Sequence, residues 1–448
     1  MMTRVAYFLI CLGLVLPSMG VLAAEDEDED LDVIFLNDGT TVRTKVSKDD
    51  YVLVIGRRGH STVKKESYKV KDVLRANRPP EYDIGLDRYK EGRYAVAAKY
   101  FTRSLRSKDF KDTPWVIEYC NYRLGEAMYD GGFFDGYKGK TYTYKPPAQY
   151  YAAVLKANPK SRFLLDASVK LPICLVEQKK YAEAEKAFVT AEAKIKQYRE
   201  ETAKTAILEY RKQAERAKAM LMLGKARLME KKKDFAQATQ IYMSVQRLAR
   251  GKFPETYADG VDGELRCLVK QDRFEDAKAR AKSLIDQYQK KHDQGLVSML
   301  PGAYTVMGRA SLALAGEYDK NNNPLQAQQS YADARWYYLQ VLVQFFDREE
   351  YLEEANYFVG LCYDKLKADE PMGKDMAIRY WLNVQRNYPD GTFGEQAKND
   401  LARIGYEPPA KKKADPTAAP AKKEPAKEAP GKKGPAKKGS AKKGGEQK

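Results

Sequence analysis

Histidine is almost absent from this chain: His60 and His292 are the two histidines among its 448 residues. Two isolated histidines exclude most Ser–His–Asp triads and histidine-rich metal sites. The sequence also lacks a Walker loop, a glycine-rich dinucleotide fingerprint and a Cys-x-x-Cys pair. Its carboxylates stand among lysines and arginines, which is typical of solvated helix faces. We therefore expect no catalytic residue, metal, cofactor or small-molecule substrate, and no feature favours a carboxylate-dependent glycosidase.

Long apolar runs are scarce as well. The one candidate, Val5–Leu16, is shorter than the roughly 20 residues that span a membrane. Arg4 precedes it, and the small residues of Val21-Leu-Ala-Ala24 follow it. This order predicts a secretory signal peptide over residues 1–24, cleaved after one of the two alanines, with an uncleaved membrane anchor as the alternative. We expect an exported protein, periplasmic or extracellular, that is soluble after cleavage.

Cysteine usage fits a chain without a disulfide framework. Cys11 lies inside the apolar run, away from the small residues, which argues against a lipid-anchored cysteine. The other four are widely separated, each within an apolar helical pattern: Cys120, Cys174, Cys267 and Cys362. Disulfide frameworks show closer spacing in smaller domains. We expect four buried free thiols, with disulfide pairing as the alternative.

A stripe of large and small residues returns six times between residues 94 and 384. Its first copy places Tyr94, Ala97, Phe101 and Ser104 at i, i+3, i+7 and i+10, on one face of a helix. An alanine between bulky residues lets a neighbouring helix approach, so the stripe predicts stacked antiparallel helix pairs. The later copies are Tyr181-Ala184-Phe188-Ala191, Phe235-Ala238-Tyr242-Val245, Phe274-Ala277-Ala281-Leu284, Tyr331-Ala334-Tyr338-Val341 and the variant Lys374-Ala377-Trp381-Val384.

Glycine-containing dipeptides stand before these stripes: Ile84-Gly85, Leu124-Gly125, Leu223-Gly224, Met307-Gly308 and Val359-Gly360. Together with the stripes they resemble the tetratricopeptide repeat (TPR) signature in residue type and spacing. The resemblance implies that residues 79–407, after the boundary at Pro79-Pro80, form a mostly α solenoid of about seven helix pairs. An eighth helix, Gly394–Ile404, would close its far end. The core positions implied are Gly85, Tyr94, Ala97, Phe101, Tyr181, Ala184, Phe188, Ala238, Ala277, Ala334, Ala377 and Trp381.

The sequence departs from that signature in two ways. Consecutive signature alanines from Ala184 to Ala377 are 39 to 57 residues apart, against a usual period of about 34. Because no glycine or proline lies between Ile173 and Leu223, we expect extended helices there. In the second repeat, Pro147 stands where the alanine should be.

By the same resemblance, the first helices of successive pairs line a concave groove that receives partner proteins. The groove residues implied are Tyr119, Tyr122, Tyr129, Lys218, Lys225, Arg309, Tyr357 and Asp364. Tyrosine offers an apolar ring with a polar tip, and Lys or Arg holds carboxylates. The loop 131–144, dense in glycine and aromatic residues, suits either a binding loop or a segment folded back into the groove.

The N-terminal part of the mature chain has a different pattern. Residues 25–31 form an acidic leader, and residues 32–78 show strand periodicity around the hairpin signal Asn37-Asp38-Gly39. This part resembles the small SH3-like or Sm-like barrels of bacterial envelope proteins. Since a module this small buries little core, we expect it to dock on the first helical pair as an end cap. Nucleic-acid binding is the alternative, through a basic hairpin: Arg57, Arg58, Lys64 and Lys65.

Residues 408–448 consist mainly of Lys, Ala, Pro and Gly, with thirteen lysines against four acidic residues. This composition predicts a disordered cationic tail. We interpret the whole chain as an exported, non-enzymatic scaffold that binds other envelope proteins or peptides. The alternative is a binder of anionic polymers, nucleic acid or a membrane surface through the tail and the β module.

Overall fold

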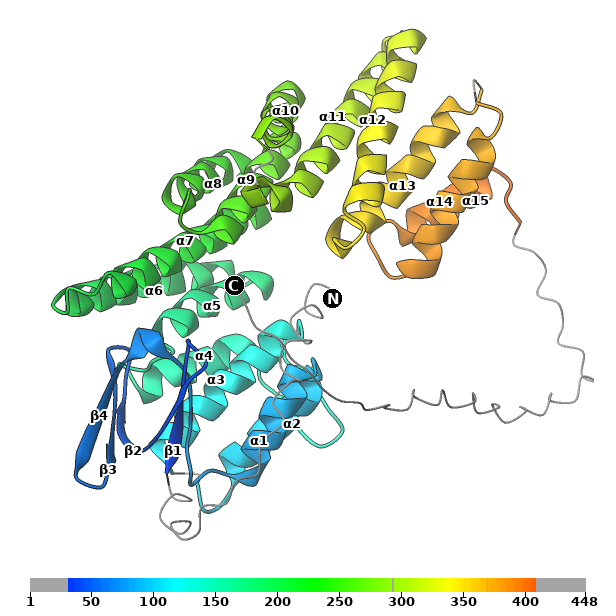
Figure 1. The fold of residues 1–448 in the computed structure, drawn as a ribbon. Coiled ribbons are helices and arrows are strands. Elements are labelled where there is room, and N and C mark those ends of the chain that lie inside the picture. Colours follow the sequence, from blue (N-terminus) through cyan, green and yellow to red (C-terminus); the bar gives the residue numbers. More distant parts are fainter. Residues whose placement is uncertain (1–30, 111, 292–293, 369, 408–448) are drawn as a thin grey trace, which may run out of the picture. The chain divides into compact units, whose positions relative to one another are not determined.

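The structure is a computed structural model that describes residues 31–110, 112–291, 294–368 and 370–407 (Figure 1). The predicted signal peptide, nearly all of the acidic leader and the lysine-rich tail lie outside the described residues. The described chain begins as a small antiparallel sheet and continues as fifteen α-helices. This is the predicted fold class, a TPR-like helical solenoid preceded by a small β module.

Five antiparallel strands form the β module, in the order β4-β3-β2-β1-β5. The turn at Asn37-Asp38-Gly39 forms as expected, because Gly39 has φ +85° and the Asp38 carboxylate accepts a hydrogen bond from the Thr40 amide at 2.9 Å. The strands are β1 (Asp32–Leu36), β2 (Thr41–Asp49), β3 (Leu53–Arg58), β4 (Ser61–Glu66) and β5 (Val70–Leu74), with a 3₁₀ turn at Ser67–Lys69.

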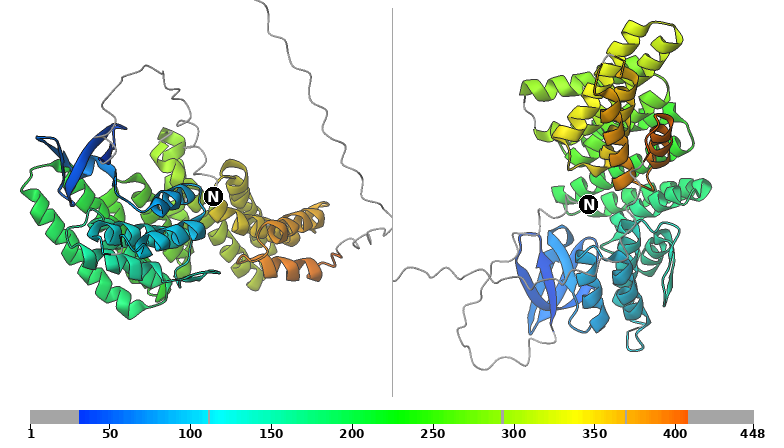
Figure 2. Two further views of the ribbon diagram at one scale, coloured as in Figure 1. Left: turned by 90° about the horizontal axis from the view of Figure 1, so that it is seen from below. Right: turned by 90° about the vertical axis from the view of Figure 1, so that its right-hand side faces the viewer.

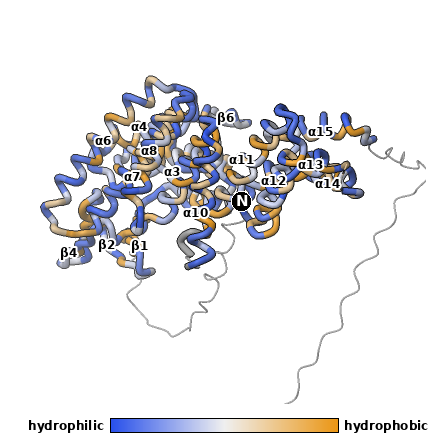
Figure 3. Tube along the Cα trace, turned by 90° about the horizontal axis from the view of Figure 1, so that it is seen from above, coloured by the Kyte–Doolittle hydropathy of each residue, from blue (hydrophilic) through white to orange (hydrophobic). Residues whose placement is uncertain are grey.

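The helices follow one another as antiparallel pairs, each with an odd-numbered first helix and an even-numbered second helix. Apolar and hydrophilic residues alternate along the helices (Figure 3). This pattern gives a helix an apolar face that can pack against a neighbouring helix. Their bounds are α1 (Pro80–Lys90), α2 (Tyr94–Arg106), α3 (Pro114–Asp130), α4 (Pro147–Ala157), α5 (Leu164–Glu177), α6 (Tyr181–Ala203), α7 (Leu208–Lys231), α8 (Phe235–Ala249), α9 (Pro254–Lys270), α10 (Phe274–Lys291), α11 (Leu300–Lys320), α12 (Pro324–Gln344), α13 (Glu349–Leu366), α14 (Gly373–Asn387) and α15 (Gly394–Arg403). A 3₁₀ segment (Gln294–Met299) precedes α11, and two short strands, β6 (Tyr137–Lys138) and β7 (Thr143–Tyr144), lie between α3 and α4.

Glycine and aromatic residues of the repeats meet directly. A Cβ atom at Gly85 would lie 2.6 Å from the ring of Phe101, and one at Gly308 would lie 2.6 Å from the ring of Tyr338. Each glycine therefore lets the second helix of its own pair approach closely. In the middle of the chain the partner changes: Gly263 of α9 meets Tyr242 of α8, the helix just before it.

The stripe alanines lie at the closest helix contacts. All six have no exposed surface: Ala97, Ala184, Ala238, Ala277, Ala334 and Ala377. The aromatic residues four positions later are buried too, with Phe101 and Trp381 at 0% exposure and Phe188 at 1%. Tyr94 and Tyr181, which open their helices, are only partly buried.

Helix lengths explain the long repeat spacing. Helices α6 and α7 have 23 and 24 residues, as the stretch without glycine and proline predicts. The irregular second repeat also has a physical reason. Pro147 is the first residue of α4, where its missing amide proton and fixed φ are tolerated.

The four described cysteines, Cys120, Cys174, Cys267 and Cys362, are free and buried, as expected. Burial raises the pKa of each thiol, so none has the thiolate character of a reactive cysteine. Within the described ranges, we find no helix whose length and hydropathy would let it cross a lipid bilayer.

The position of the β module corrects the sequence-based expectation. It does not rest on the first pair alone as an end cap. One apolar cluster runs from Ile34 of β1 to Leu228 of α7, so the sheet shares its core with several repeats. Figure 2 shows the sheet, in blue, next to cyan and green helices of the chain. The expectation missed residues far away in sequence that receive the sheet, on α3, just before α5, on α6 and on α7.

A buried tyrosine, a carboxylate and a cation meet at several places, and we call three of these, each built from three successive helices, the tyrosine triads. In the first, Glu126 of α3 accepts a hydrogen bond from the Tyr151 hydroxyl of α4 at 2.6 Å and from the Lys170 ammonium of α5 at 2.7 Å. The second joins Glu230 of α7, Tyr242 of α8 and Arg266 of α9, and the third joins Arg309 of α11, Tyr338 of α12 and Glu354 of α13. Each triad ties both helices of one pair to the first helix of the next.

Replacing Ala184 by Leu should destabilise the protein by about 1–3 kcal/mol, because the added atoms overpack a closed helix contact. Ala182, exposed on the same helix, provides the control: Ala182→Leu should change the free energy of unfolding by less than about 0.5 kcal/mol. Chemical denaturation of the two variants measures the difference. Equal effects would mean that the stripe does not mark the helix contacts.

Replacing Glu126 by Gln should lower the free energy of unfolding by about 1.5–3 kcal/mol, because it removes charged hydrogen bonds and leaves Lys170 without its partner. The control is Glu200→Gln, since the Lys196–Glu200 pair is exposed and 3.9 Å apart; it should change stability by at most about 0.5 kcal/mol. Urea denaturation compares the two. A loss at Glu126 no larger than that of the control would show that the triad contributes nothing to stability.

Candidate functional site

The β module covers the part of the first-helix surface formed by α3, α5 and α7. Several polar contacts attach it, three of which involve residues of α3, of the segment before α5, and of α7. The Arg123 guanidinium of α3 pairs with Asp72 of β5 at 2.6 Å, and Arg162, just before α5, donates to the carbonyl oxygen of Val70 at 2.9 Å. The Tyr210 hydroxyl of α7 donates to the Val52 carbonyl oxygen. These contacts fix the sheet against the face that sequence analysis assigned to a partner.

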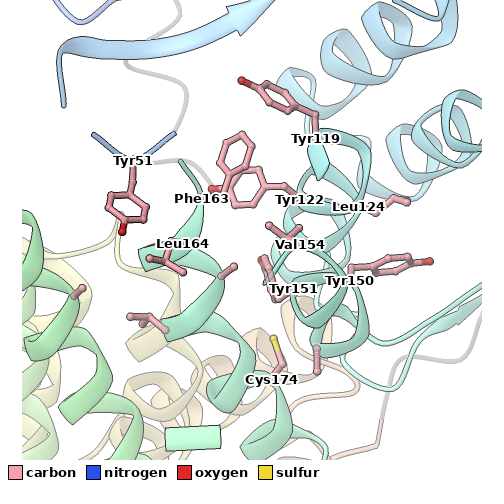
Figure 4. Close-up of a cluster of buried hydrophobic side chains, with 14 of the residues drawn as sticks. Tyr51, Tyr119, Tyr122, Leu124, Tyr150, Tyr151, Val154, Phe163, Leu164 and Cys174 are labelled. Carbon is pink, nitrogen blue, oxygen red and sulfur yellow. The ribbon is translucent and has the colours of Figure 1, made fainter. Parts of the chain in front are cut away.

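Two of the predicted groove tyrosines lie beneath the sheet. Tyr119 is 1% exposed and donates to Asp49 of β2, while Tyr122 is 7% exposed and donates to Asp166 at 3.1 Å. Both rings pack on Phe163, which Figure 4 shows beside Tyr122. Burial raises the pKa of both phenols, so they remain neutral hydrogen-bond donors. Tyr119 offers no surface to a partner protein while the β module is in place, and Tyr122 is covered mainly by Phe163 and Tyr151.

The other groove residues are scattered over four helices. Tyr129 is partly buried, with the Lys170 ammonium 5.2 Å from its ring centre. Lys218 is exposed on α7, and Lys225 pairs with Glu192 at 2.5 Å. Of these three residues, only Lys218 has a charged group without an ion pair or hydrogen bond to another residue in the described part of the chain.

Towards the end of the helices, predicted groove residues bind within the chain. Arg309 belongs to the third tyrosine triad. The Tyr357 hydroxyl donates to Asp400 of α15 at 2.9 Å, and Asp364, 5% exposed, pairs with Arg403 of α15 at 2.7 Å. Tyr357 and Asp364 therefore hold the last helix. The structure does not bring the eight residues together into one site.

The loop 131–144 folds back on the helices. Its strands β6 and β7 pair, and the Tyr137 and Tyr144 rings stack at 5.8 Å. The Arg106 guanidinium of α2 lies 5.0 Å from the ring centre of Tyr142, and the Gln178 amide donates to the Phe134 carbonyl oxygen at 2.8 Å. The loop thus forms a small hairpin held against neighbouring helices, and both interpretations of it, a binding loop or a segment in the groove, stay predictions.

An exposed apolar row that sequence analysis missed runs along the end of α12. It consists of Trp336 and Val343 on α12 and Phe346 two residues beyond it, and these are 50%, 70% and 72% exposed. We call these three residues the α12 row. These apolar residues are visible in the sequence, but they lie next to the packing stripe of the same helix, so the two apolar faces are hard to tell apart. The stripe residues Ala334 and Tyr338 are buried. A helix that is apolar on two faces has one more face than its own pair can bury.

In the described ranges, no cluster of three or more His, Cys, Asp or Glu side chains is placed to hold a metal ion. His60 is exposed in the turn between β3 and β4, and His292 lies outside the described residues.

No protein-family model and no curated protein matches the sequence. Among solved structures, BtubC from P. vanneervenii is 14% identical over 60% of this chain and 92% of BtubC, with a TM-score of 0.35. A STAND protein with a tetratricopeptide repeat sensor from Pyrococcus horikoshii is 12% identical over 78% of this chain, with a TM-score of 0.35; the match spans 53% of that protein, about half its length. The TPR domain of P58(IPK) is 12% identical over 72% of this chain and 97% of that domain, with a TM-score of 0.20.

These likenesses are too distant to assign a function. The TPR-like description rests on the helix pairs themselves, on their glycine–aromatic contacts and on their buried alanines.

The contact between Tyr51 and Glu201 predicts a pH dependence of stability. Hydrogen bonds from Tyr51 and Gln197 lower the pKa of Glu201 to about 2, whereas the pKa of a glutamate in an unfolded chain is about 4.3. A carboxyl group whose pKa is lowered by folding stabilises the folded state at pH values above the pKa it has in the unfolded chain. This contribution is lost as the pH falls through the pKa that the group has in the folded protein. Glu201→Gln should therefore flatten the pH dependence of unfolding between about 4.3 and 2.

Tyr51→Phe should flatten the same part of the profile, while Glu200→Gln on the same helix serves as the control and should leave it unchanged. Denaturation at a series of pH values measures all three variants. A Glu201→Gln profile parallel to that of the unchanged protein would show that this contact does not depend on ionised Glu201.

Proposed function

We propose that this chain is an exported protein-binding scaffold of the cell envelope, without a catalytic role. The observation that carries the proposal is the exposed α12 row, Trp336, Val343 and Phe346. Tryptophan and phenylalanine contribute strongly to protein interfaces when a partner excludes water from them. Large apolar side chains gathered along one line mark an interaction surface, whereas single exposed ones are ordinary.

The geometry of the row suits a partner with its own apolar side chains. Seven residues of helix rise about 10.5 Å, so Trp336 and Val343 lie two turns apart on the same face of α12. Phe346 follows where the helix has ended, and it extends the apolar surface beyond Val343. An amphipathic helix or an extended apolar segment of another protein would match that line. Tyr304 and Tyr337 pack against Trp336, at ring-centre distances of 6.2 and 5.1 Å.

The first-helix groove stays part of the proposal as a second contact surface. Lys218, exposed on α7, is its most accessible residue. Tyr119 would reach a partner only if the β module moved away from α3, and Tyr122 only if Phe163 and Tyr151 moved away from its ring. The remaining charged or hydroxyl-bearing residues would have to exchange contacts within the chain for contacts with the partner, which lowers their expected contribution. These residues are Tyr129, Lys225, Arg309, Tyr357 and Asp364.

The composition of residues 408–448 favours a second candidate function. Thirteen lysines in this segment suit an anionic envelope polymer, nucleic acid or a membrane surface. In this case the helices would act as a spacer, and binding would weaken steeply with salt.

Truncating the row should separate these functions. The double variant Trp336→Ala, Phe346→Ala should reduce the capture of envelope proteins by about 30-fold or more, because an interface anchor typically contributes about 2 kcal/mol or more. Deleting residues 408–448 should leave capture largely unchanged at physiological salt. Quantitative pull-down from envelope extract, with helix content checked by circular dichroism, measures both.

The control removes two exposed apolar side chains elsewhere, Val189 and Met243, which are 65% and 48% exposed. The Val189→Ala, Met243→Ala variant should capture partners as the unchanged protein does. Capture that survives loss of the α12 row but disappears with residues 408–448 would reject the scaffold in favour of the polymer binder.

A further inference from the structure

A pocket of about 590 Å³ lies between the β module and the helices, and we call it the sub-sheet pocket. Its cationic lining residues are Lys71 of β5, Arg123 of α3, Arg162 just before α5, Lys170 within α5 and Arg216 of α7. Its volume is within the range of about 300–1,000 Å³ that is usual for sites of small molecules. Tyr51, Tyr122 and Phe163, which also line it, appear together in Figure 4.

The charge of the lining is one-sided. Five of its residues are cationic, and Asp166 is its one carboxylate. Two of the cations have partners behind the pocket wall, since Arg123 pairs with Asp72 at 2.6 Å and Lys170 pairs with Glu126 at 2.7 Å. These two pairs are close to neutral, so the unpaired positive charge of the lining comes from the other three cations, Arg162, Lys71 and Arg216.

Arg162 is incompletely paired although its side chain is only 6% exposed. Its Nη2 donates to the Val70 carbonyl oxygen, but its Nη1 has no hydrogen-bond partner in the described part of the chain. The nearest carboxylate oxygen, on Asp49, is 4.0 Å away, and Asp49 also faces Arg75 at 3.7 Å. A buried donor without an acceptor is unfavourable, and one carboxylate shared by two guanidinium groups neutralises neither fully.

Two further cations stand where solvent reaches the pocket. Lys71 and Arg216 are exposed, and neither forms an ion pair or a side-chain hydrogen bond with any residue the structure describes. They come from different elements, β5 and α7, and both line the same pocket. The pocket thus combines one buried, under-paired guanidinium with two available cations at its mouth.

We propose that the sub-sheet pocket binds a small oxyanion, the phosphate or carboxylate group of an organic molecule, with Arg162 at its base and Lys71 and Arg216 at its mouth. A guanidinium N–H can donate a charged hydrogen bond to an oxygen of either group. The rings of Tyr51, Tyr122 and Phe163 provide apolar wall for the organic part of the ligand. This site is independent of the α12 row and adds a small-molecule ligand to a chain whose sequence predicts none.

The test measures binding of inorganic phosphate and of citrate to the full chain by isothermal titration calorimetry at constant ionic strength. At least one of the two probes should bind saturably to the unchanged protein and raise its melting temperature. The double variant Lys71→Ala, Arg216→Ala should weaken this binding about tenfold or more, because it removes two charged contacts to the oxyanion. Both side chains are exposed, so their removal disturbs no buried contact. Arg162→Gln should abolish it, and Arg162→Lys should retain part of it.

A matched control separates the pocket from the general positive charge of the chain. Lys282 and Lys290 are exposed on α10, away from the pocket lining, and Lys282→Ala, Lys290→Ala removes the same charge as the mouth variant. The control should bind as the unchanged protein does. Saturable binding of phosphate but not of citrate would identify a phosphorylated ligand. Saturable binding of citrate but not of phosphate would identify a carboxylate ligand.

Two outcomes would overturn the proposal. The first is the absence of saturable binding of both probes by the unchanged protein. The second is an equal loss of affinity in the mouth variant and in the α10 control, since that result would mean non-specific attraction. If Arg162→Gln does not fold, the mouth variant and its control still decide the question.

Discussion

The tyrosine triads are the constraint on which the helical arrangement depends. An apolar stripe alone would let one helix pair slide or rotate against the next, because apolar contacts have no direction. A hydroxyl, a carboxylate and a cation meet within hydrogen-bond distance only over a narrow range of distances and angles. In the first triad Tyr151, Glu126 and Lys170 come from three helices, so the position of α5 relative to α3 and α4 is set by that contact. The ionic groups are retained inside the helix stack because each has its partner there.

The triads recur at every second junction, with the charges reversed in the last. In the first two, the earlier first helix supplies the glutamate and the later one the cation, while in the third Arg309 lies on α11 and Glu354 on α13. A tyrosine from the second helix of the pair is present each time, at the aromatic position of the repeat in α8 and α12. The same side chain thus fills the space beside a glycine and supplies a directional contact, which links repeat packing to repeat register.

Placement of the β module decides which surfaces remain for partners. The sheet covers Tyr119, whose hydroxyl binds Asp49, and forms one side of the sub-sheet pocket. The accessible apolar residues then lie elsewhere, above all in the α12 row. A surface for proteins and a pocket for a small anion are compatible on one chain, because the residues that carry them belong to different repeats.

Much of the fold could be predicted from the sequence, because the information was local. The spacing of Ala97 and Phe101 determined a helix with one packing face, and the absence of glycine and proline between Ile173 and Leu223 determined two long helices. The hairpin at Asn37-Asp38-Gly39 also follows from residues next to one another in the chain. Each of these features needs only neighbouring residues, so a single sequence is enough to find it.

The candidate sites could not be predicted in the same way, because they depend on contacts between residues far apart in sequence. Tyr119 meets Asp49 across 70 positions, and Tyr51 meets Glu201 across 150. No local pattern states that the sheet docks on α3, α5 and α7, that Arg162 lacks a partner for its Nη1, or that the second face of α12 has no helix to cover it. The sequence by itself determined the helices and their packing stripes, since periodicity is a property of neighbouring residues. Only the tertiary structure decided which of those surfaces are covered, because burial depends on what the distant parts of the chain bring to them.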